Sequence, residues 1–291
     1  MIRIKVPATS ANIGVGFDAL GLAVSFYGTV YFDTSDEKLE IVGCPKKYQN
    51  DHNLIYLAFK RACKYIKKPV PNLKIIVNND IPIARGLGSS AVCIVAGLKG
   101  ASVWFENALS DEEILNIATK MEGHPDNVSP AIYGGMCASI NDDGDIHVAQ
   151  YEINKKLNFI AMIPNYPIST HAAREVLPDK MSYADAIYQI GHLGVLIKAL
   201  ELGDFKMIQS AIVDRMHEPY RKALIPDYDK IAKICKDNNS ILYISGSGST
   251  LMAISKEENI DNLFDNVSKE FPNWQVKPLT VDTVGATAEI V

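Results

Sequence analysis

The chain has few cysteines, and none is placed for a metal or disulfide site. Its five cysteines are scattered over 291 residues, without a Cys-x-x-Cys pair. An odd, scattered set argues against a disulfide framework and a structural zinc site. None of the six histidines lies in a His-Glu-x-x-His sequence, so the commonest zinc-hydrolase pattern is also absent.

The sequence also lacks an excess of positive charge and any membrane-length apolar run. A net charge of −5 and a pI near 5.7 argue against a nucleic-acid-binding protein, which normally has a basic face. No segment approaches the roughly 20 apolar residues of a membrane-spanning helix. Residues 1–6 lack the apolar core of a signal peptide and Pro7 follows them, so we expect a cytoplasmic location.

What is present is a mixture of strand and helix patterns without strict βαβ order, which favours an α+β fold over a doubly wound sheet. We expect strands at 2–6, 24–33, 73–77, 133–140, 158–163, 241–244 and 250–254. We expect helices at 52–67, 89–106, 111–121, 183–202, 205–216, 228–238 and 258–271.

The most informative segment is a Gly/Ser-rich loop between the strand that ends at Val77 and the apolar helix that follows. Two glycines and two serines stand where the loop enters the helix: Gly86, Gly88, Ser89 and Ser90. Glycine lets the backbone approach a ligand, and the free N–H groups of a helix N-terminus suit an anion. The serine hydroxyls could cap the helix or face a phosphate or its metal ion. A simple capped turn is the structural alternative, and a P-loop is excluded because no Gly-Lys-Ser/Thr follows.

The full string from Pro82 to Ala91 is more specific, because it resembles the ATP-binding motif of the GHMP kinase family. The segment Asp51–Ile55 similarly resembles the family's adenine-side segment. The resemblance implies that ATP is bound by Asn53, Pro82, Ile83, Ala84, Arg85, Gly86, Leu87, Gly88, Ser89, Ser90, Ala91 and Val92.

A second glycine-containing string runs from Pro7 to Asp18 after the first strand. Its Gly14-x-Gly16-x-x-Ala19 spacing fits a dinucleotide-binding fingerprint, but Pro7 ends the expected strand and no helix opens at Gly16. A polar hairpin is the structural alternative. The string resembles the first GHMP motif in the homoserine kinase branch, which implies that Asn12 and Asp18 face the acceptor substrate.

Glu122 is expected in the last turn of the helix 111–121, where a carboxylate opposes the helix dipole. A cation partner such as Mg²⁺ would explain that placement, and a solvated surface glutamate is the alternative. The string Glu122–Asn127 resembles homoserine kinases, which implies that Ser90 and Glu122 hold Mg²⁺. We expect His124 to be a structural partner of Asp126.

Asn127 stands where other GHMP kinases are understood to place an aspartate, so the resemblance implies that its amide orients the acceptor hydroxyl instead of deprotonating it. The expected catalytic residues are Asp18, Glu122 and Asn127. Two further segments resemble those that hold the substrate carboxylate, through Arg174 and Arg221. Arginine suits that task because its planar fork meets a carboxylate with two hydrogen bonds, although a single arginine is more often a surface residue.

The resemblance covers nearly the whole chain, since a third motif, with Ser249 in place of the usual proline, follows at Ser245–Thr250. It implies a ribosomal-protein-S5-like ATP-binding domain at 1–154, a ferredoxin-like domain at 155–291 and a site between them. The implied reaction is transfer of phosphate from Mg²⁺-ATP to L-homoserine in threonine biosynthesis, without nucleic acid or membrane and with a homodimer as the expected assembly. The alternatives are another GHMP kinase, such as one acting on mevalonate, and a non-catalytic ATP- or metabolite-binding regulator.

Overall fold

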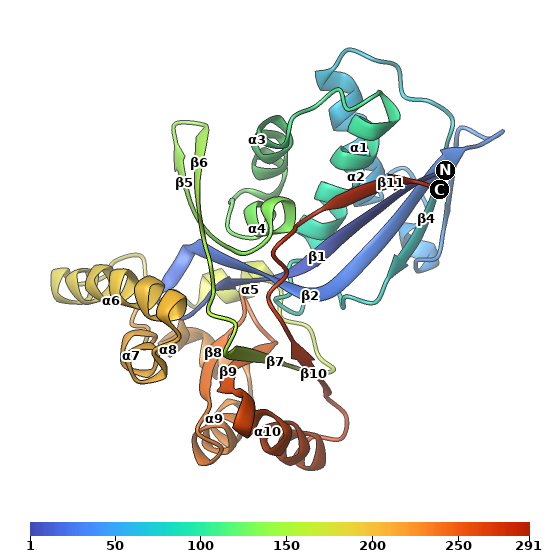
Figure 1. The fold of residues 1–291 in the computed structure, drawn as a ribbon. Coiled ribbons are helices and arrows are strands. Elements are labelled where there is room, and N and C mark those ends of the chain that lie inside the picture. The colour runs from blue at the N-terminus through green and yellow to red at the C-terminus, as the bar shows by residue number, and fades with distance from the viewer.

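The computed structural model describes residues 1–291 and contains two sheets, each covered by helices (Figure 1). The first sheet has seven strands, in the order β11-β1-β2-β4-β3, and the hairpin β5–β6 pairs with β2. Its strands are β1 (Ile2–Asn12), β2 (Gly16–Thr34), β3 (Leu39–Val42), β4 (Leu73–Asn79), β5 (Met136–Asp142), β6 (Asp145–Tyr151) and β11 (Thr287–Ile290).

Four helices cover one face of this sheet: α1 (Leu54–Tyr65), α2 (Ser89–Trp104), α3 (Asp111–Glu122) and α4 (Val128–Tyr133). Helix α2 is the buried one and contacts the other three as well as the sheet. Gly97 and Gly100 permit that packing, because a Cβ there would lie 2.2 Å from the Ile55 carbonyl oxygen and 2.4 Å from the Phe32 ring. The position of α2 against α1 and β2 is therefore fixed by close packing in the core.

The second sheet has four antiparallel strands, β10-β7-β9-β8, and its two faces pack into different cores. Phe159, Tyr243 and Ile254 face the core shared with the first sheet, whereas Ile160 and Ile244 face the outer helices. The strands are β7 (Leu157–Ile163), β8 (Ile241–Ile244), β9 (Leu251–Lys256) and β10 (Gln275–Leu279), and the outer helices are α9 (Tyr228–Asp237) and α10 (Glu257–Glu270).

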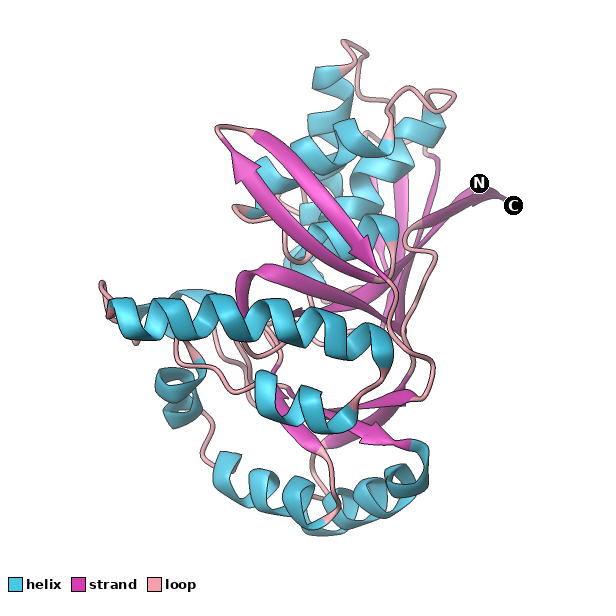
Figure 2. Cartoon of the chain, turned by 60° about the vertical axis from the view of Figure 1, so that its left-hand side comes forward, coloured by secondary structure: helices cyan, strands magenta, loops and turns pink.

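The remaining helices lie beside the second sheet (Figure 2). They are α5 (Thr170–Glu175), α6 (Tyr183–Leu202), α7 (Phe205–Ala211) and α8 (Glu218–Arg221), with short 3₁₀ turns at Lys46–Tyr48 and Lys222–Leu224. No helix is long and apolar enough to cross a membrane.

The prediction that the first strand ends at Pro7 is wrong. Strand β1 continues to Asn12, and its register with β2 shifts between Pro7 and Ala8. A bulge of this kind accommodates a residue that has no N–H to donate. The hairpin named as the structural alternative is present, since β2 begins at Gly16 and pairs antiparallel with β1, but its turn is buried.

The expected helix 205–216 is also too long, because α7 ends at Ala211. The chain then turns so that the Asp214 carboxylate accepts hydrogen bonds from the backbone N–H groups of Met216, His217 and Glu218. Asp214 therefore fixes the turn that leads into α8, and the predicted helix 205–216 covers α7 together with the non-helical turn after it.

The chain ends in the first sheet, where β11 pairs with β1 and the two termini lie side by side (Figure 1). The Val291 backbone N–H donates to the Met1 carbonyl at 3.0 Å. The predicted domain boundary between residues 154 and 155 stays a proposal. That boundary assigns residues 287–290 to the second domain, whereas in the structure they form a strand of the first sheet.

Candidate active site

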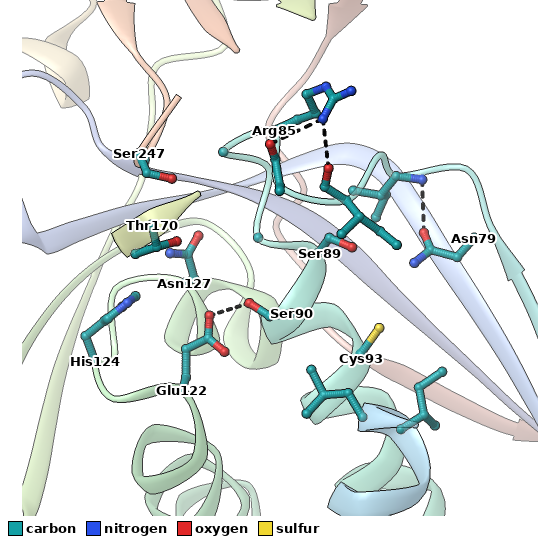
Figure 3. Close-up of a pocket in the computed structure, with 18 of the residues that line it drawn as sticks. Asn79, Arg85, Ser89, Ser90, Cys93, Glu122, His124, Asn127, Thr170 and Ser247 are labelled. Carbon is teal, nitrogen blue, oxygen red and sulfur yellow. Dashed lines mark hydrogen bonds between the residues drawn. The ribbon is translucent and has the colours of Figure 1, made fainter. Parts of the chain in front are cut away.

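A cleft of about 420 Å³ opens at the N-terminus of α2, between the two sheets. Its walls come from segments far apart in the chain, and Figure 3 shows them converging on the end of this helix. Its lining includes Asn12, Asp18, Asn53, Ile83, Ala84, Arg85, Gly86, Gly88, Ser89, Ser90, Glu122, His124, Asp126, Asn127, Thr170, Arg174, Arg221, Gly246 and Ser247. The structure thus brings most of the predicted site residues together.

The loop before α2 has the backbone of an anion site. Ala84, Gly86 and Gly88 have φ values of +55°, +73° and +64°, and such turns direct successive N–H groups toward one point. A Cβ at Gly86 would lie 2.1 Å from the Ser245 carbonyl oxygen, and one at Gly88 would lie 1.9 Å from the Thr9 hydroxyl. Both positions therefore require glycine.

The N-terminus of α2 carries no side-chain cap and no acidic residue in its first turn. The N-cap is Gly88, so the first of the two alternatives for the serines, a cap on this helix, is absent. Because Ser89 and Ser90 already belong to the helix, the N–H groups of the first turn and the positive end of the dipole face the cleft.

Arg85 lines the cleft, but its guanidinium is already bound to the protein. Its Nε and Nη2 donate to the carbonyl oxygens of Pro164 and Asn165 at 3.0 Å each. Its Nη1 donates to the carbonyl oxygen of Ile83, within the loop itself, at 3.1 Å (Figure 3). Arg85 therefore ties the loop to the segment after β7, and its guanidinium donors are used within the protein. Four other predicted ATP residues lie outside the cleft lining: Pro82, Leu87, Ala91 and Val92. The last three are buried in the core.

Asn53 is the N-cap of α1. Its Oδ1 accepts hydrogen bonds from the Ile55 and Tyr56 N–H groups, and its Nδ2 donates to the Tyr48 carbonyl at 2.8 Å. The side chain thus shapes this wall, and its polar atoms are used within the protein. Apolar groups that the sequence reasoning did not single out surround this end of the cleft, among them Pro45, Tyr48, Leu54, Val77 and Ile81.

Glu122 is the last residue of α3, as predicted, and accepts a hydrogen bond of 2.5 Å from the Ser90 hydroxyl (Figure 3). Burial raises the pKa of Glu122, and the bond from Ser90 partly offsets that rise. The carboxylate therefore stands against the helix dipole and in a desolvated place, where a cation would stabilise it. The expected pairing of His124 Nδ1 with the Asp126 carboxylate is confirmed, and this hydrogen bond raises the pKa of His124.

On the other side of the cleft, Asp18 and Arg174 form an ion pair with two hydrogen bonds of 2.9 Å. Asp18 has a φ of +55°, and its N–H donates to Asn12 Oδ1 at 3.1 Å. The Asn12 amide in turn donates to the Gly246 carbonyl at 2.8 Å. Asn12 therefore holds the β1–β2 turn against the loop after β8 and sets the position of Asp18.

Arg221 is 3% exposed, and its guanidinium donates to the carbonyl oxygens of Ala173 and Gly246 at 3.1 and 3.0 Å. Burial lowers the pKa of Arg221 to about 10, so the group stays charged at neutral pH. The Phe17 ring lies 4.9 Å from the Cζ of Arg221 and 5.7 Å from the Cζ of Arg174. The Phe17 ring thus attracts both cations.

Sequence reasoning missed Phe17, Thr9 and His217. The Thr9 hydroxyl donates to Asn127 Oδ1 at 2.7 Å. The His217 ring stacks on Phe17 and contacts the Gly14 carbonyl through Nε2 at 2.9 Å, and burial lowers the pKa of His217. All three stand in strings that the motif comparison already covered, but their roles depend on contacts across the two sheets.

Glu218, the first residue of α8, is a buried carboxyl group whose raised pKa makes the stability of the protein depend on pH. Burial raises the pKa of its carboxyl from 4.5 to about 8, while one oxygen accepts from the Ile244 N–H at 2.6 Å. The folded state then binds more protons than the unfolded state between pH 4.5 and 8, so stability falls as pH rises through that interval. The loss is at most about 1.4 kcal/mol per pH unit.

Glu218→Gln removes this titration and keeps the acceptor oxygen, so we expect the variant to have a higher melting temperature than the wild type at pH 8.5 and no advantage at pH 5. Thermal unfolding followed by circular dichroism at both pH values measures the difference. Glu270→Gln, at an exposed position, is the control. A difference that is the same at both pH values would contradict the account.

The anion cradle faces a carboxylate–hydroxyl pair on one side and two guanidinium groups on the other. This arrangement suits phosphoryl transfer from a nucleotide to a small acidic acceptor, so the fold and the cleft define the class of small-molecule kinases. The chain belongs to the GHMP kinase family: the models of the GHMP kinases N terminal domain and the GHMP kinases C terminal domain match residues 53–135 and 196–273.

Relatives with a curated name match over nearly the whole length. The homoserine kinase of Clostridium botulinum (strain ATCC 19397 / Type A) is 40% identical to this chain. The alignment covers 98% of this chain and 97% of the relative. The homoserine kinase of Clostridium beijerinckii is 37% identical, with 98% of it and 99% of this chain aligned.

Solved structures of homoserine kinases are also similar to this chain over nearly its whole length. The homoserine kinase of Cytophaga hutchinsonii superposes with a TM-score of 0.88 at 28% identity, over 99% of this chain and 97% of that one. A putative homoserine kinase from Listeria monocytogenes gives 0.84 at 28% identity over the full length of both chains. The mevalonate kinase of Methanococcus jannaschii gives 0.73 at 18% identity, over 97% of this chain and 98% of that one, and shares the fold. The predicted two-domain GHMP kinase fold is confirmed.

Proposed function

We propose that this protein is a kinase that transfers the terminal phosphate of ATP to the hydroxyl of L-homoserine, forming O-phospho-L-homoserine for threonine biosynthesis. The observation that carries the proposal is the Asp18–Arg174 pair beside Arg221. An anion and a cation held side by side match the α-ammonium and α-carboxylate of an amino acid. Mevalonate has a carboxylate but no amino group, so the pair favours homoserine over a mevalonate-type acceptor.

On the donor side, the main-chain N–H groups of the loop and of the first turn of α2 bind the ATP phosphates in this proposal. No cluster of three or more acidic, histidine or cysteine side chains forms a protein-only metal site. That suits Mg²⁺, which is commonly held by one or two carboxylates together with substrate phosphates. Ser90 and Glu122 would hold the ion, which neutralises phosphate charge when bound.

On the acceptor side, Arg221 and Arg174 bind the homoserine carboxylate, and Asp18 faces the ammonium or hydroxyl group. Binding of the carboxylate to Arg174 competes with its present contact to Asp18, so the acceptor exchanges one ion pair for two. Phe17 keeps the two guanidinium groups in place. The acceptor hydroxyl is then held toward Asn127, whose amide orientation is fixed by Thr9.

This site works without a strong general base. An amide cannot take up a proton at neutral pH, but a loose transition state needs little deprotonation of the attacking oxygen. Positioning of the hydroxyl and stabilisation of phosphate charge supply most of the rate.

We therefore expect kcat to stay nearly constant from about pH 6.5 to 9, and Asn127→Asp to gain no activity. Steady-state rates over this range measure both, and His124→Gln separates any contribution of that imidazole, whose pKa is raised by Asp126. A steep rise in kcat near pH 7 that disappears in Asp18→Asn would reveal a general base and contradict this mechanism.

A non-catalytic regulator on the same fold is the alternative from another class. A protein that only binds ATP has no need for the Ser90–Glu122 pair together with an acceptor site across the cleft. The presence of both therefore favours a kinase over a regulator. A cytoplasmic location and an assembly of two identical subunits belong to the proposal.

Identification of the product tests the proposed function. We expect ³¹P NMR of a reaction with Mg²⁺-ATP and L-homoserine to show ADP and a phosphate monoester coupled to the adjacent CH₂ protons. The same mixture with EDTA is the control. Formation of inorganic phosphate alone would leave only an ATPase and would overturn the proposal.

A further inference from the structure

His217 is a completely buried histidine on the acceptor side of the cleft, and both of its ring nitrogens have partners within the protein. Nε2 lies 2.9 Å from the Gly14 carbonyl oxygen, and Nδ1 lies 3.5 Å from Nη1 of Arg221. A carbonyl oxygen only accepts and a guanidinium only donates, so Nε2 carries the proton and Nδ1 is the acceptor. The two contacts therefore define one neutral tautomer of the ring.

Asp214 keeps this ring in place. Its buried carboxylate accepts hydrogen bonds from the backbone N–H of His217 at 2.7 Å and from the side chain of Gln189. Gln189 also donates to the Val15 carbonyl at 3.0 Å, next to the carbonyl of Gly14 that His217 holds. Burial lowers the pKa of His217, which favours the neutral ring that these contacts require.

The contact with Gly14 fixes the turn between β1 and β2, which leads to Asp18. Gly14 has a φ of +68°, and a Cβ there would lie 2.3 Å from the Ile212 carbonyl oxygen, so the turn packs closely against the chain after α7. The His217 ring also stacks on Phe17, with the ring centroids 5.1 Å apart and the planes inclined by 24°. The ring thus holds the turn at two of its residues.

Arg221 has only one guanidinium nitrogen left for a ligand. Its Nε donates to the Ala173 carbonyl at 3.1 Å, and its Nη1 donates both to the Gly246 carbonyl at 3.0 Å and to His217 Nδ1 at 3.5 Å. Nη2 makes no hydrogen bond within the protein and is not completely buried. Because Arg221 lines the cleft, the two N–H groups of Nη2 are the donors that remain for a ligand there.

We infer that His217 is a positioning residue for the acceptor: it holds Nη1 of Arg221 and the β1–β2 turn in a fixed relation, so that Nη2 alone meets the acceptor carboxylate. This role rests on the proposed function, in which Arg221 binds that carboxylate. It also makes that function more specific, because a fork of two guanidinium nitrogens is not available from Arg221. The other carboxylate oxygen is then left to Arg174.

Two replacements of His217 separate its two contacts. Glutamine keeps a donor at the Nε2 position without an acceptor at Nδ1, whereas asparagine keeps an acceptor at the Nδ1 position and leaves a larger gap in the core. We expect His217→Gln to raise the KM for homoserine by about 10-fold, because a hydrogen bond to a charged group is lost, and to change kcat and the KM for ATP by less than about 2-fold. His217→Asn is expected to raise the KM for homoserine less, although it is the more disruptive replacement.

His147→Gln, at an exposed position on β6 outside the cleft, is the matched control and should keep wild-type constants. A KM for homoserine in His217→Gln equal to that of the wild type, or a rise as large in His217→Asn, would overturn the inference while the proposed function stands. A wild type that does not turn over homoserine would overturn the proposed function, and the role of His217 with it.

A double-mutant cycle distinguishes action through Arg221 from a general loss of structure. In the Arg221→Ala background, the group that His217 holds is absent, so His217→Gln should change the KM for homoserine by less than about 2-fold. The same 10-fold rise in both backgrounds would show that His217 does not act through Arg221 and would overturn the inference.

The tautomer can be measured in the wild-type protein, so this test does not depend on the folding of a variant. Correlation spectra that join ¹⁵N and ¹H in the imidazole rings are expected to show a histidine that keeps the neutral Nε2–H form from about pH 5 to 8, where an ordinary imidazole titrates. His192, whose Nδ1 lies 2.8 Å from the Tyr188 carbonyl oxygen, should instead carry its proton on Nδ1 when neutral. Spectra without a permanently neutral Nε2–H ring would overturn the inference.

Discussion

Glu122→Ala is expected to lower kcat by about 10²–10³-fold while the protein stays folded. The substitution removes the carboxylate that accepts from Ser90 at 2.5 Å at the N-terminus of α2. Neutralisation of phosphate charge by a bound cation is a large part of the rate in phosphoryl transfer. Initial rates of ADP release at saturating ATP and homoserine measure the effect, with a thermal unfolding curve to establish that the variant is folded.

The matched control is Glu112→Ala, an exposed glutamate in the first turn of the same helix, which should retain wild-type turnover. The concentration of Mg²⁺ required for half-maximal rate is a second readout and should rise in Glu122→Ala only. Wild-type turnover of this variant at low Mg²⁺ would show that Glu122 does not hold the ion.

Arg221→Ala is expected to raise the KM for homoserine by about 30-fold or more while the KM for ATP changes little. Loss of one partner of a desolvated charge pair costs about 2–5 kcal/mol, and the acceptor carboxylate would lose such a partner. Arg174→Ala is expected to have a smaller effect in the same direction, because its side chain is 42% exposed and already shared with Asp18.

Arg215→Ala is the control for both variants. Arg215 is exposed, pairs with Asp185 and does not line the cleft. Full saturation curves for each substrate separate the two KM values. A loss of ATP affinity equal to the loss of homoserine affinity in Arg221→Ala would place that arginine on the phosphate side.

The local part of the site could be predicted from sequence. A strand, a glycine-rich loop and an apolar helix in succession determine where main-chain N–H groups point, and the structure has this order at β4 and α2. The last-turn position of Glu122 and the His124–Asp126 contact also follow from short sequence distances. The roles assigned to these residues in binding and catalysis stay predictions.

The parts that depend on contacts between distant segments could not be predicted. Arg85 looked like a phosphate ligand in its motif, but carbonyl groups after β7 engage its guanidinium. Asp18 and Arg174 were each expected to contact the substrate, and their contact with each other was not predicted. The two residues are 156 positions apart in the sequence, so no local pattern indicates that they pair. The return of β11 to β1 was missed because a four-residue edge strand with exposed side chains gives no alternating pattern.

The most direct test of the central claim is ADP release with Mg²⁺-ATP and a panel of acceptors: L-homoserine, L-threonine, mevalonate and galactose. We expect rapid, stoichiometric ADP release with L-homoserine, because only this acceptor combines an α-ammonium, an α-carboxylate and a primary hydroxyl. Threonine has the same charges with a hydroxyl one carbon nearer, and mevalonate has no ammonium. Equal or faster turnover of mevalonate or galactose than of L-homoserine would contradict the account.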